Sequence, residues 1–344
     1  MNCPIGIPQP RRYAGPVTLF LLGLLTVALG GDPAPGDTNA VLTRPSGPSS
    51  PSGPLLSPAS DTDPSVEKEY EKLLADDNAA QAEVDKWILD NNEFRAGGGG
   101  MPDSEMNRRI RERFDPVRGA YADFIARHPS HVRARIAYGS FLGDLRDDAG
   151  ARIQWEKALE LDPKNPAIFN NLAGRYGENG APAKAFELYS KAMDLAPAEP
   201  LYCHNLADSI VAFRRSAMEF YGLAEQPLLE KILGLYSNAS RMAPDNFPYA
   251  SDLAQTYYGI KPFPADTALR AWTNAFKRAS DDLEREGVCL HLARVKMLGG
   301  RFVEARAQLD SVTNQSYSAL KDNLLATIQN RERTAASTNS PPAP

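Results

Sequence analysis

Two stretches of the chain, 132–163 and 166–197, match each other when one is shifted by a fixed step. Pro163 and Pro197 end the two stretches and lie 34 residues apart, and Pro129 lies the same distance before Pro163. A step of about 34 residues with small residues at fixed positions is typical of helical hairpins that stack side by side. The period therefore predicts an all-α solenoid in which each hairpin packs on the next.

The residues inside each period follow one pattern. On the first helix a Gly or Ala follows a large residue, and on the second helix an aromatic residue lies between two alanines. The second period shows it best, with Leu172, Ala173, Tyr176, Ala185, Tyr189, Ala192 and Pro197. The second-helix aromatics of the first four periods are Trp155, Tyr189, Tyr236 and Trp272. This pattern resembles the tetratricopeptide repeat (TPR). The resemblance implies a right-handed superhelical solenoid, and because the family is defined by stacking, it implies no particular chemistry.

The chain divides as follows in this interpretation. We expect repeats one to five near 132–165, 166–199, 200–246, 247–282 and 286–317, after a degenerate unit at 104–131. An N-terminal helical segment covers 63–103, opened by Asp63-Pro64, with a possible break at 76–78 and a Gly-rich break at 97–100. Asp115-Pro116 is expected to restart a helix. A capping helix at 318–331 and a disordered tail at 332–344 complete the chain.

The first 62 residues predict a leader and a spacer. Arg11 and Arg12 precede the apolar run 17–29, and Ala28 and Gly30 suit cleavage, so 1–30 reads as a signal peptide. Residues 31–62 are rich in Pro, Ser and Gly and predict a disordered spacer. We therefore expect an exported protein, periplasmic or secreted, with no stable membrane span after cleavage. The alternative is an uncleaved N-terminal anchor.

Repeat three is longer than its neighbours. Pro197 and Pro244 lie 47 residues apart, and the extra material is about 214–226. No Pro or Gly occurs between 201 and 221, so we expect the first helix to run on, with Gly222 as its C-cap and Pro227 starting the next helix. The extension carries Phe220 and Tyr221. They either pack on a neighbouring turn or form a projecting surface for recognition of a partner or for self-association.

First helices of such repeats line one face of the solenoid. We expect the following residues to form a binding groove: Arg133, Asn170, Asn171, His204, Asn205, Asp208, Ser251, Asp252, Gln255 and Arg294. The amides and imidazole can hydrogen-bond a peptide backbone, and the two arginines can hold carboxylates. The alternative for each residue is an ordinary solvated polar position. The predicted function is a non-enzymatic scaffold that binds a peptide or partner protein.

Motifs for catalysis, cofactors or metals are absent from the sequence, so we expect no catalytic residue, cofactor or metal site. His128 and His131 have a spacing that suits two metal ligands, but the sequence indicates no third ligand nearby.

A net charge of −5 argues against a nucleic-acid partner. Cys203 and Cys289 are expected to be small buried apolar residues. The alternative function is an enzyme or accessory domain that processes glycans or peptides with Asp208 and Asp252 as a carboxylate pair.

Overall fold

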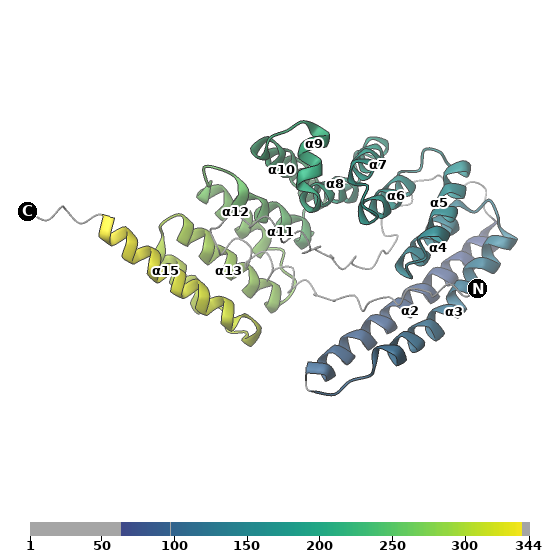
Figure 1. Ribbon diagram of the computed structural model, residues 1–344, viewed down its shortest axis with the longest axis horizontal. Helices are drawn as coiled ribbons and strands as arrows, with labels where there is room; N and C mark the ends of the chain where they lie inside the picture. The colour runs from purple at the N-terminus through teal and green to yellow at the C-terminus, as the bar shows by residue number, and fades with distance from the viewer. Residues whose placement is uncertain (1–62, 97, 339–344) are drawn as a thin grey trace, which may run out of the picture. The chain divides into compact units, whose positions relative to one another are not determined.

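The computed structural model describes residues 63–96 and 98–338, and every regular element in these ranges is helical (Figure 1). The predicted leader 1–30 and spacer 31–62 lie outside the described residues. Among the helices that are described, none combines the length and the apolar character that crossing a membrane requires. The all-α architecture predicted from the period is confirmed.

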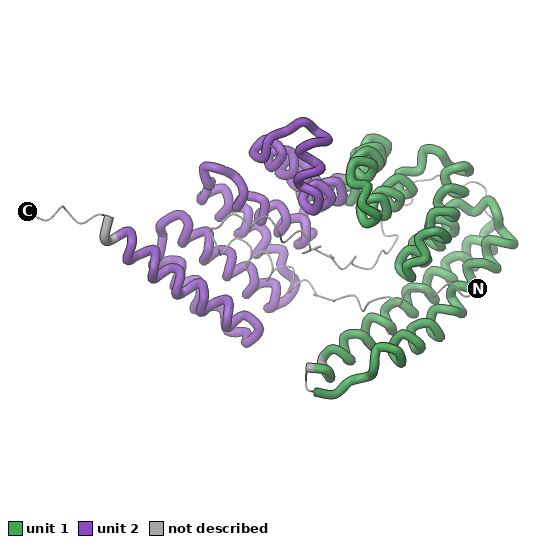
Figure 2. The backbone as a smooth tube through the Cα atoms, in the orientation of Figure 1, with its two compact units in different colours: residues 1–13, 42–202 green, residues 14–41, 203–344 purple. Residues whose placement is uncertain are grey.

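The chain forms two compact units, which Figure 2 colours separately. Described residues up to 202 belong to unit 1 and those from 203 onward to unit 2. The helices of unit 1 are α2 (Pro64–Ala96), α3 (Asp103–Arg127), α4 (Val132–Asp144), α5 (Asp148–Leu161), α6 (Pro166–Glu178) and α7 (Pro182–Leu195). They pair in order as α2 with α3, α4 with α5 and α6 with α7.

Unit 2 continues the same plan with an additional short helix and two short 3₁₀ elements. Its elements are α8 (Pro200–Ala212, whose first three residues belong to unit 1), α9 (Arg214–Tyr221), α10 (Glu225–Met242), α11 (Phe247–Thr256), η1 (Tyr257–Gly259), α12 (Ala265–Phe276), α13 (Asp282–Leu298), α14 (Phe302–Asp310), η2 (Gln315–Tyr317) and α15 (Ser318–Thr338). Helices α11 with α12 and α13 with α14 form hairpins, and α15 packs against α13 and α14.

The first hairpin differs from the prediction. Helix α2 runs through 76–78 without a break, because the Asp77 carboxylate is buried and accepts hydrogen bonds from the Tyr121 hydroxyl (2.6 Å) and the Gln81 amide (2.8 Å). Helix α3 runs through Pro116, because Phe114 and Val117 are buried on either side of the proline. This packing outweighs the cost of an interior proline, about 3 kcal/mol. The predicted degenerate unit 104–131 is therefore not a hairpin by itself, and α3 pairs with α2 instead.

Three predicted boundaries in unit 2 also differ from those in the structure. The first helix of repeat three does not run on, because the chain turns at Phe213 (φ −116°, ψ 45°), where α8 ends and α9 begins. Gly222 caps α9 in the left-handed conformation as predicted, whereas α10 begins at Glu225, two residues before Pro227. At the C-terminus α15 continues beyond 331 to Thr338, because Glu332 pairs with Arg306 of α14.

The cores of the hairpins contain the predicted small and aromatic residues. On the first helices of the five repeats, Gly139, Ala173, Ala207, Ala254 and Ala293 are all buried. On the second helices, Trp155, Tyr236 and Trp272 are buried, whereas Tyr189 is half-buried. The alanines next to these aromatics, including Ala151, Ala158, Ala268 and Ala275, expose no surface. Small residues thus leave sockets that the rings fill, which is how each hairpin closes.

The turns inside the hairpins of repeats one, two and five each contain a left-handed residue, and in repeat one this residue is not glycine. Gly180 of repeat two and Gly300 of repeat five have φ values of 79° and 75°, whereas Arg146 of repeat one has φ 62°. The left-handed backbone conformation costs a residue with a Cβ about 1–2 kcal/mol of conformational free energy, whereas glycine adopts it without this cost. We expect Arg146→Gly to raise the free energy of unfolding by about 1 kcal/mol and Gly180→Ala to lower it by a similar amount. Urea denaturation followed by circular dichroism measures both, and a change of the same sign in the two variants would contradict the assignment.

Cys203 on α8 and Cys289 on α13 are free, buried thiols, as predicted. Burial raises the pKa of the Cys203 thiol, which keeps it in the unreactive protonated form.

Candidate functional site

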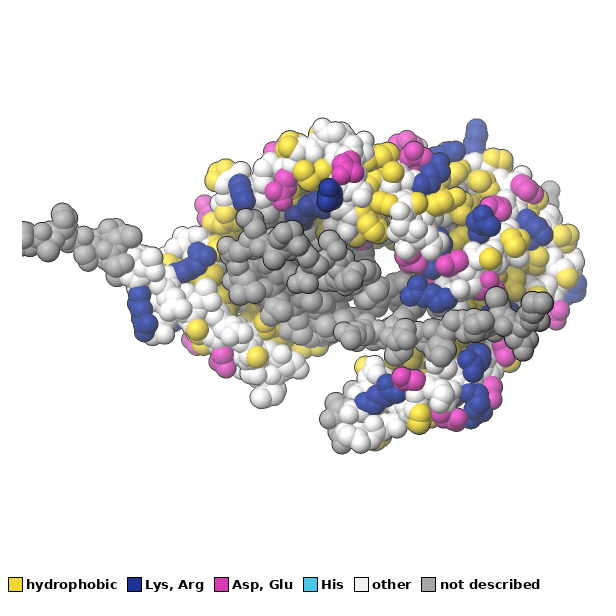
Figure 3. All heavy atoms as spheres, viewed as in Figure 1, with side chains coloured by type: hydrophobic (Ala, Val, Ile, Leu, Met, Phe, Trp, Pro, Cys, Tyr) yellow, Lys and Arg dark blue, Asp and Glu magenta, His cyan; other side chains and the backbone are white. Residues whose placement is uncertain are grey.

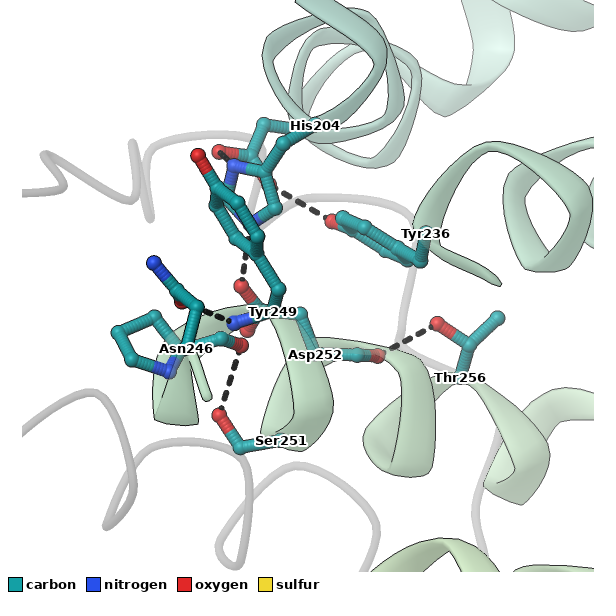
Figure 4. Close-up of polar contacts among 9 residues, drawn as sticks. His204, Tyr236, Asn246, Tyr249, Ser251, Asp252 and Thr256 are labelled. Carbon is teal, nitrogen blue, oxygen red and sulfur yellow. Dashed lines mark hydrogen bonds and ion pairs between the residues drawn. The ribbon is translucent and has the colours of Figure 1, made fainter. Parts of the chain in front are cut away.

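The polar residues predicted to line a groove lie on first helices, and in unit 2 they form a connected cluster. His204 and Asp208 are one turn apart on α8 and share a face of that helix. Asp252 comes from α11, the first helix of the following repeat. We call His204, Asp208, Tyr236, Tyr249 and Asp252 the His204 cluster. Figure 4 shows how the side chains of His204, Tyr236, Tyr249 and Asp252 converge.

The imidazole of His204 lies between two carboxylates. Its Nε2 is 2.7 Å from Asp252 Oδ2, and its Nδ1 is 3.3 Å from Asp208 Oδ2. The His204 side chain is 1% exposed, whereas 36% of the Asp252 side chain and 24% of the Asp208 side chain are exposed. The cluster therefore has a buried imidazole and two carboxylates that solvent reaches.

Aromatic residues hold the cluster in place. The Tyr236 hydroxyl of α10 donates a hydrogen bond of 2.7 Å to Asp208 Oδ1, which fixes the orientation of that carboxylate. The Tyr249 ring of α11 lies over the imidazole, with ring centroids 4.4 Å apart. His204 consequently contacts side chains from three helices and cannot turn freely.

The local structure of α11 positions Asp252. Asn246 caps the helix by accepting a hydrogen bond from the Tyr249 backbone N–H (2.9 Å), and the Thr256 hydroxyl donates to the Asp252 carbonyl (2.8 Å) (Figure 4). The Ser251 hydroxyl donates to the Pro248 carbonyl (2.9 Å). Ser251 was predicted as a groove residue, but it is buried and bonds to its own helix.

A second histidine lies deeper in unit 2. The His291 ring of α13 stacks on Trp272 of α12, with centroids 3.9 Å apart and an interplanar angle of 7°. The Tyr258 hydroxyl lies 3.2 Å from His291 Nδ1, and the Arg294 guanidinium lies over the Tyr258 ring at 5.1 Å. Burial, with a smaller contribution from Arg294, lowers the pKa of His291 well below its usual value, so the ring is neutral. Arg294 itself is buried, so its predicted role at the solvent-facing surface is not supported by its position.

The predicted residues in unit 1 make contacts within the chain. Arg133 pairs with the Glu67 carboxylate of α2 and lies over the Tyr70 ring at 5.0 Å, so the carboxylate it holds comes from its own chain. The Asn171 amide donates to the Ser140 hydroxyl (3.0 Å), and the Asn170 amide donates to the Asn171 side-chain oxygen (3.3 Å). Asn170 and Asn171 are half-buried.

Four predicted residues in unit 2 keep polar groups at a partly exposed surface. They are Asn205, Asp208, Asp252 and Gln255, which all lie on α8 or α11. We call them the α8–α11 polar face. On the side of the molecule in Figure 3, basic and acidic side chains of the described residues are interspersed over both units.

The contacts of His204 and the hydrogen bond of Tyr236 were not predicted from the sequence. A signal for the first was present, since repeat three spans 47 residues and Asp252 lies 48 residues after His204. Residues at nearly equivalent positions of adjacent first helices come close together. Tyr236 was predicted only as the second-helix aromatic of its repeat, and no pattern in the sequence indicates that its hydroxyl bonds to Asp208.

The places of the aromatic and small residues within each hairpin indicate which type of helical repeat the chain contains. In repeats one and two of unit 1, and again in repeats three and four of unit 2, the second-helix aromatic lies beside a buried alanine within the same hairpin. This arrangement resembles that of tetratricopeptide repeats.

Solved structures with similar folds include two that are described as TPR proteins. The pilF protein of Pseudomonas aeruginosa is 14% identical, with a TM-score of 0.48 over 75% of this chain and 99% of that one. The C-terminal part of a TPR repeat-containing protein from Cytophaga hutchinsonii is 12% identical, with a TM-score of 0.48 over 73% and 96%. YrrB, described as a TPR protein with an unusual peptide-binding site, is 14% identical, with a TM-score of 0.46 over 62% and 98%. No protein-family model and no curated protein matches the sequence.

Proposed function

We propose that this TPR chain is a non-enzymatic scaffold that binds an extended segment of a partner protein on the α8–α11 polar face. The observation that carries the proposal is that Asn205, Asp208, Asp252 and Gln255 place amides and carboxylates on two consecutive first helices. Asp208 and Asp252 are held by the His204 cluster, so they need little further ordering when a ligand binds.

The chemistry of this face favours a particular kind of segment. The Asn205 and Gln255 amides each offer a donor and an acceptor, which suits the backbone of an extended peptide. The Asp208 and Asp252 carboxylates are partly exposed and favour a Lys or Arg side chain. We therefore propose an extended segment that carries at least one basic residue.

A random peptide library panned against the full chain tests this proposal. Peptides recovered by panning are then measured by fluorescence anisotropy against the wild type and Asn205→Ala/Gln255→Ala. Each hydrogen-bonding group contributes about 1 kcal/mol, so the double variant is expected to bind about 10- to 100-fold more weakly.

The matched control is Asn238→Ala/Asn330→Ala, which removes two exposed amides from α10 and α15. It is expected to bind like the wild type. Recovered peptides that bind both double variants equally well would show that the α8–α11 polar face is not the binding surface.

The enzymatic alternative has one observation in its favour, because Asp208 and Asp252 approach the same imidazole. In that case Asp208→Asn would abolish hydrolysis of a glycan or peptide by the purified protein.

The leader and the spacer lie outside the described residues, and export to the periplasm or the medium remains part of our proposal. Self-association through residues 214–226 is also part of our proposal, because the Phe220 side chain in this segment is exposed.

A further inference from the structure

The His204 cluster has the composition of a metal site. One ligand atom from each of His204, Asp208 and Asp252 can be chosen so that all three lie within 4.8 Å of one another. Imidazole nitrogen and carboxylate oxygen are the donors found in many zinc sites, at about 2.0–2.2 Å from the ion. Two ligands at such distances in a tetrahedral arrangement lie about 3.3 Å apart. The 2.7 Å contact joins Asp252 Oδ2 to Nε2 and the 3.3 Å contact joins Asp208 Oδ2 to Nδ1, so each carboxylate lies near that spacing from a different ring nitrogen. The ion takes one of these nitrogens, and the carboxylate beside the other nitrogen turns toward it when the ion binds.

The surroundings fit this role as well. Residues that bind metals are usually oriented by hydrogen bonds from neighbours that do not touch the ion. Tyr236 supplies such a bond, because it occupies Oδ1 of Asp208 and leaves Oδ2 directed at the imidazole. Tyr249 covers one face of the His204 ring and limits its rotation.

Charge and access point in the same direction. Two carboxylates and a neutral imidazole together carry a charge of −2, which one divalent cation balances. Although His204 is buried, the Asp252 side chain is 36% exposed, so an ion can enter from solvent.

We propose that His204, Asp208 and Asp252 bind one divalent transition-metal ion of the zinc type, with one imidazole nitrogen and one oxygen from each carboxylate as ligands. The imidazole selects against Ca²⁺ and Mg²⁺, which prefer oxygen ligands throughout. Three protein ligands leave a coordination position for water or for a group of a bound partner. The proposal does not depend on peptide binding, because the ion is measured without peptide.

Isothermal titration of the metal-free full chain with Zn²⁺ tests the site, with Mg²⁺ and Ca²⁺ as comparison ions. We expect one Zn²⁺ per chain and no measurable heat from Mg²⁺ or Ca²⁺. His204→Gln is expected to abolish binding, and Asp208→Asn and Asp252→Asn are each expected to weaken it by at least about tenfold. The asparagine variants preserve shape, and circular dichroism checks that they fold.

Two further variants separate this site from general histidine binding and from positioning effects. His128→Gln removes another histidine beside a carboxylate, since His128 Nε2 lies 3.6 Å from Glu69, and it is expected to bind Zn²⁺ like the wild type. Tyr236→Phe is expected to weaken Zn²⁺ binding less than Asp208→Asn does. Zn²⁺ affinity unchanged in folded Asp208→Asn or Asp252→Asn, or lost in His128→Gln, would overturn the assignment. Absence of Zn²⁺ binding by the wild type would overturn it too.

Discussion

Replacing Trp155 with alanine is expected to lower the free energy of unfolding of unit 1 by about 3–5 kcal/mol. The indole is 2% exposed and lies among Ala151, Ala158 and Gly139, and its Nε1–H donates to the Ile136 carbonyl (3.2 Å). Removing the ring leaves a cavity lined by small residues, which cannot extend to fill it. Denaturation in urea followed by far-ultraviolet circular dichroism measures the change.

Gly139 provides a second and more specific test of the same socket. A Cβ at Gly139 would lie 2.4 Å from Trp155 Nε1 and 2.7 Å from Cδ1, so Gly139→Ala is expected to cost about 1–3 kcal/mol by overpacking. In the double variant with Trp155→Ala the added methyl occupies vacated space, so the combined loss is expected to be smaller than the sum of the two single losses.

The control for this cycle is Gly119→Ala on α3, where a Cβ would meet nothing within 4 Å. It is expected to stabilise the protein by about 0.5–1 kcal/mol, the usual gain for alanine over glycine inside a helix. Strictly additive losses for Gly139→Ala and Trp155→Ala would mean that the two residues do not form one socket.

Acidification is expected to destabilise unit 2 through His291. The pKa of the buried ring is lowered well below 6.5 in the folded state, whereas the unfolded chain takes up a proton near pH 6.5. Below that pH the unfolded state binds more protons, so stability is full above pH 6.5 and falls as the pH drops. The expected slope is about 1.4 kcal/mol per pH unit, or about 2 kcal/mol between pH 6.5 and pH 5.

His291→Phe isolates this contribution. Phenylalanine retains a ring that can stack on Trp272 and does not titrate, and the Tyr258 hydroxyl still lies 3.3 Å from the carbonyl of residue 291. Urea midpoints measured from pH 8 to pH 5 are expected to fall more steeply for the wild type than for the variant. The comparison is needed because burial also lowers the pKa of His131 in unit 1, which adds a pH dependence common to both proteins. Parallel pH profiles would contradict the role of His291.

The repeats could be predicted from sequence because their signals are local. The socket around Trp155 is built from Gly139, Ala151 and Ala158, which all lie within one period of 34 residues. The first hairpin could not be predicted in the same way. Its helices continue through Asp77 and Pro116 because of contacts made across the hairpin, such as the bond from Tyr121 to Asp77.

The candidate site was predicted at the level of residues and not of contacts. His204, Asp208 and Asp252 were all named from their positions on first helices, but the sequence does not state that the three side chains meet. Their meeting depends on the length of repeat three, which brings α8 and α11 together across 48 residues. Two other predicted groove residues, Ser251 and Arg294, are buried in the structure. The sequence could not show this, because it identifies them only as polar residues at first-helix positions.

The two buried thiols allow local opening of unit 2 to be measured by chemical labelling. Cys203 and Cys289 lie on α8 and α13, both within unit 2, and each is less than 6% exposed. A thiol-specific reagent therefore modifies them only when those helices open, so labelling rates read out local opening without any engineered probe. With Cys3 replaced by serine, the remaining two labels distinguish loosening near the His204 cluster from loosening near the His291 stack.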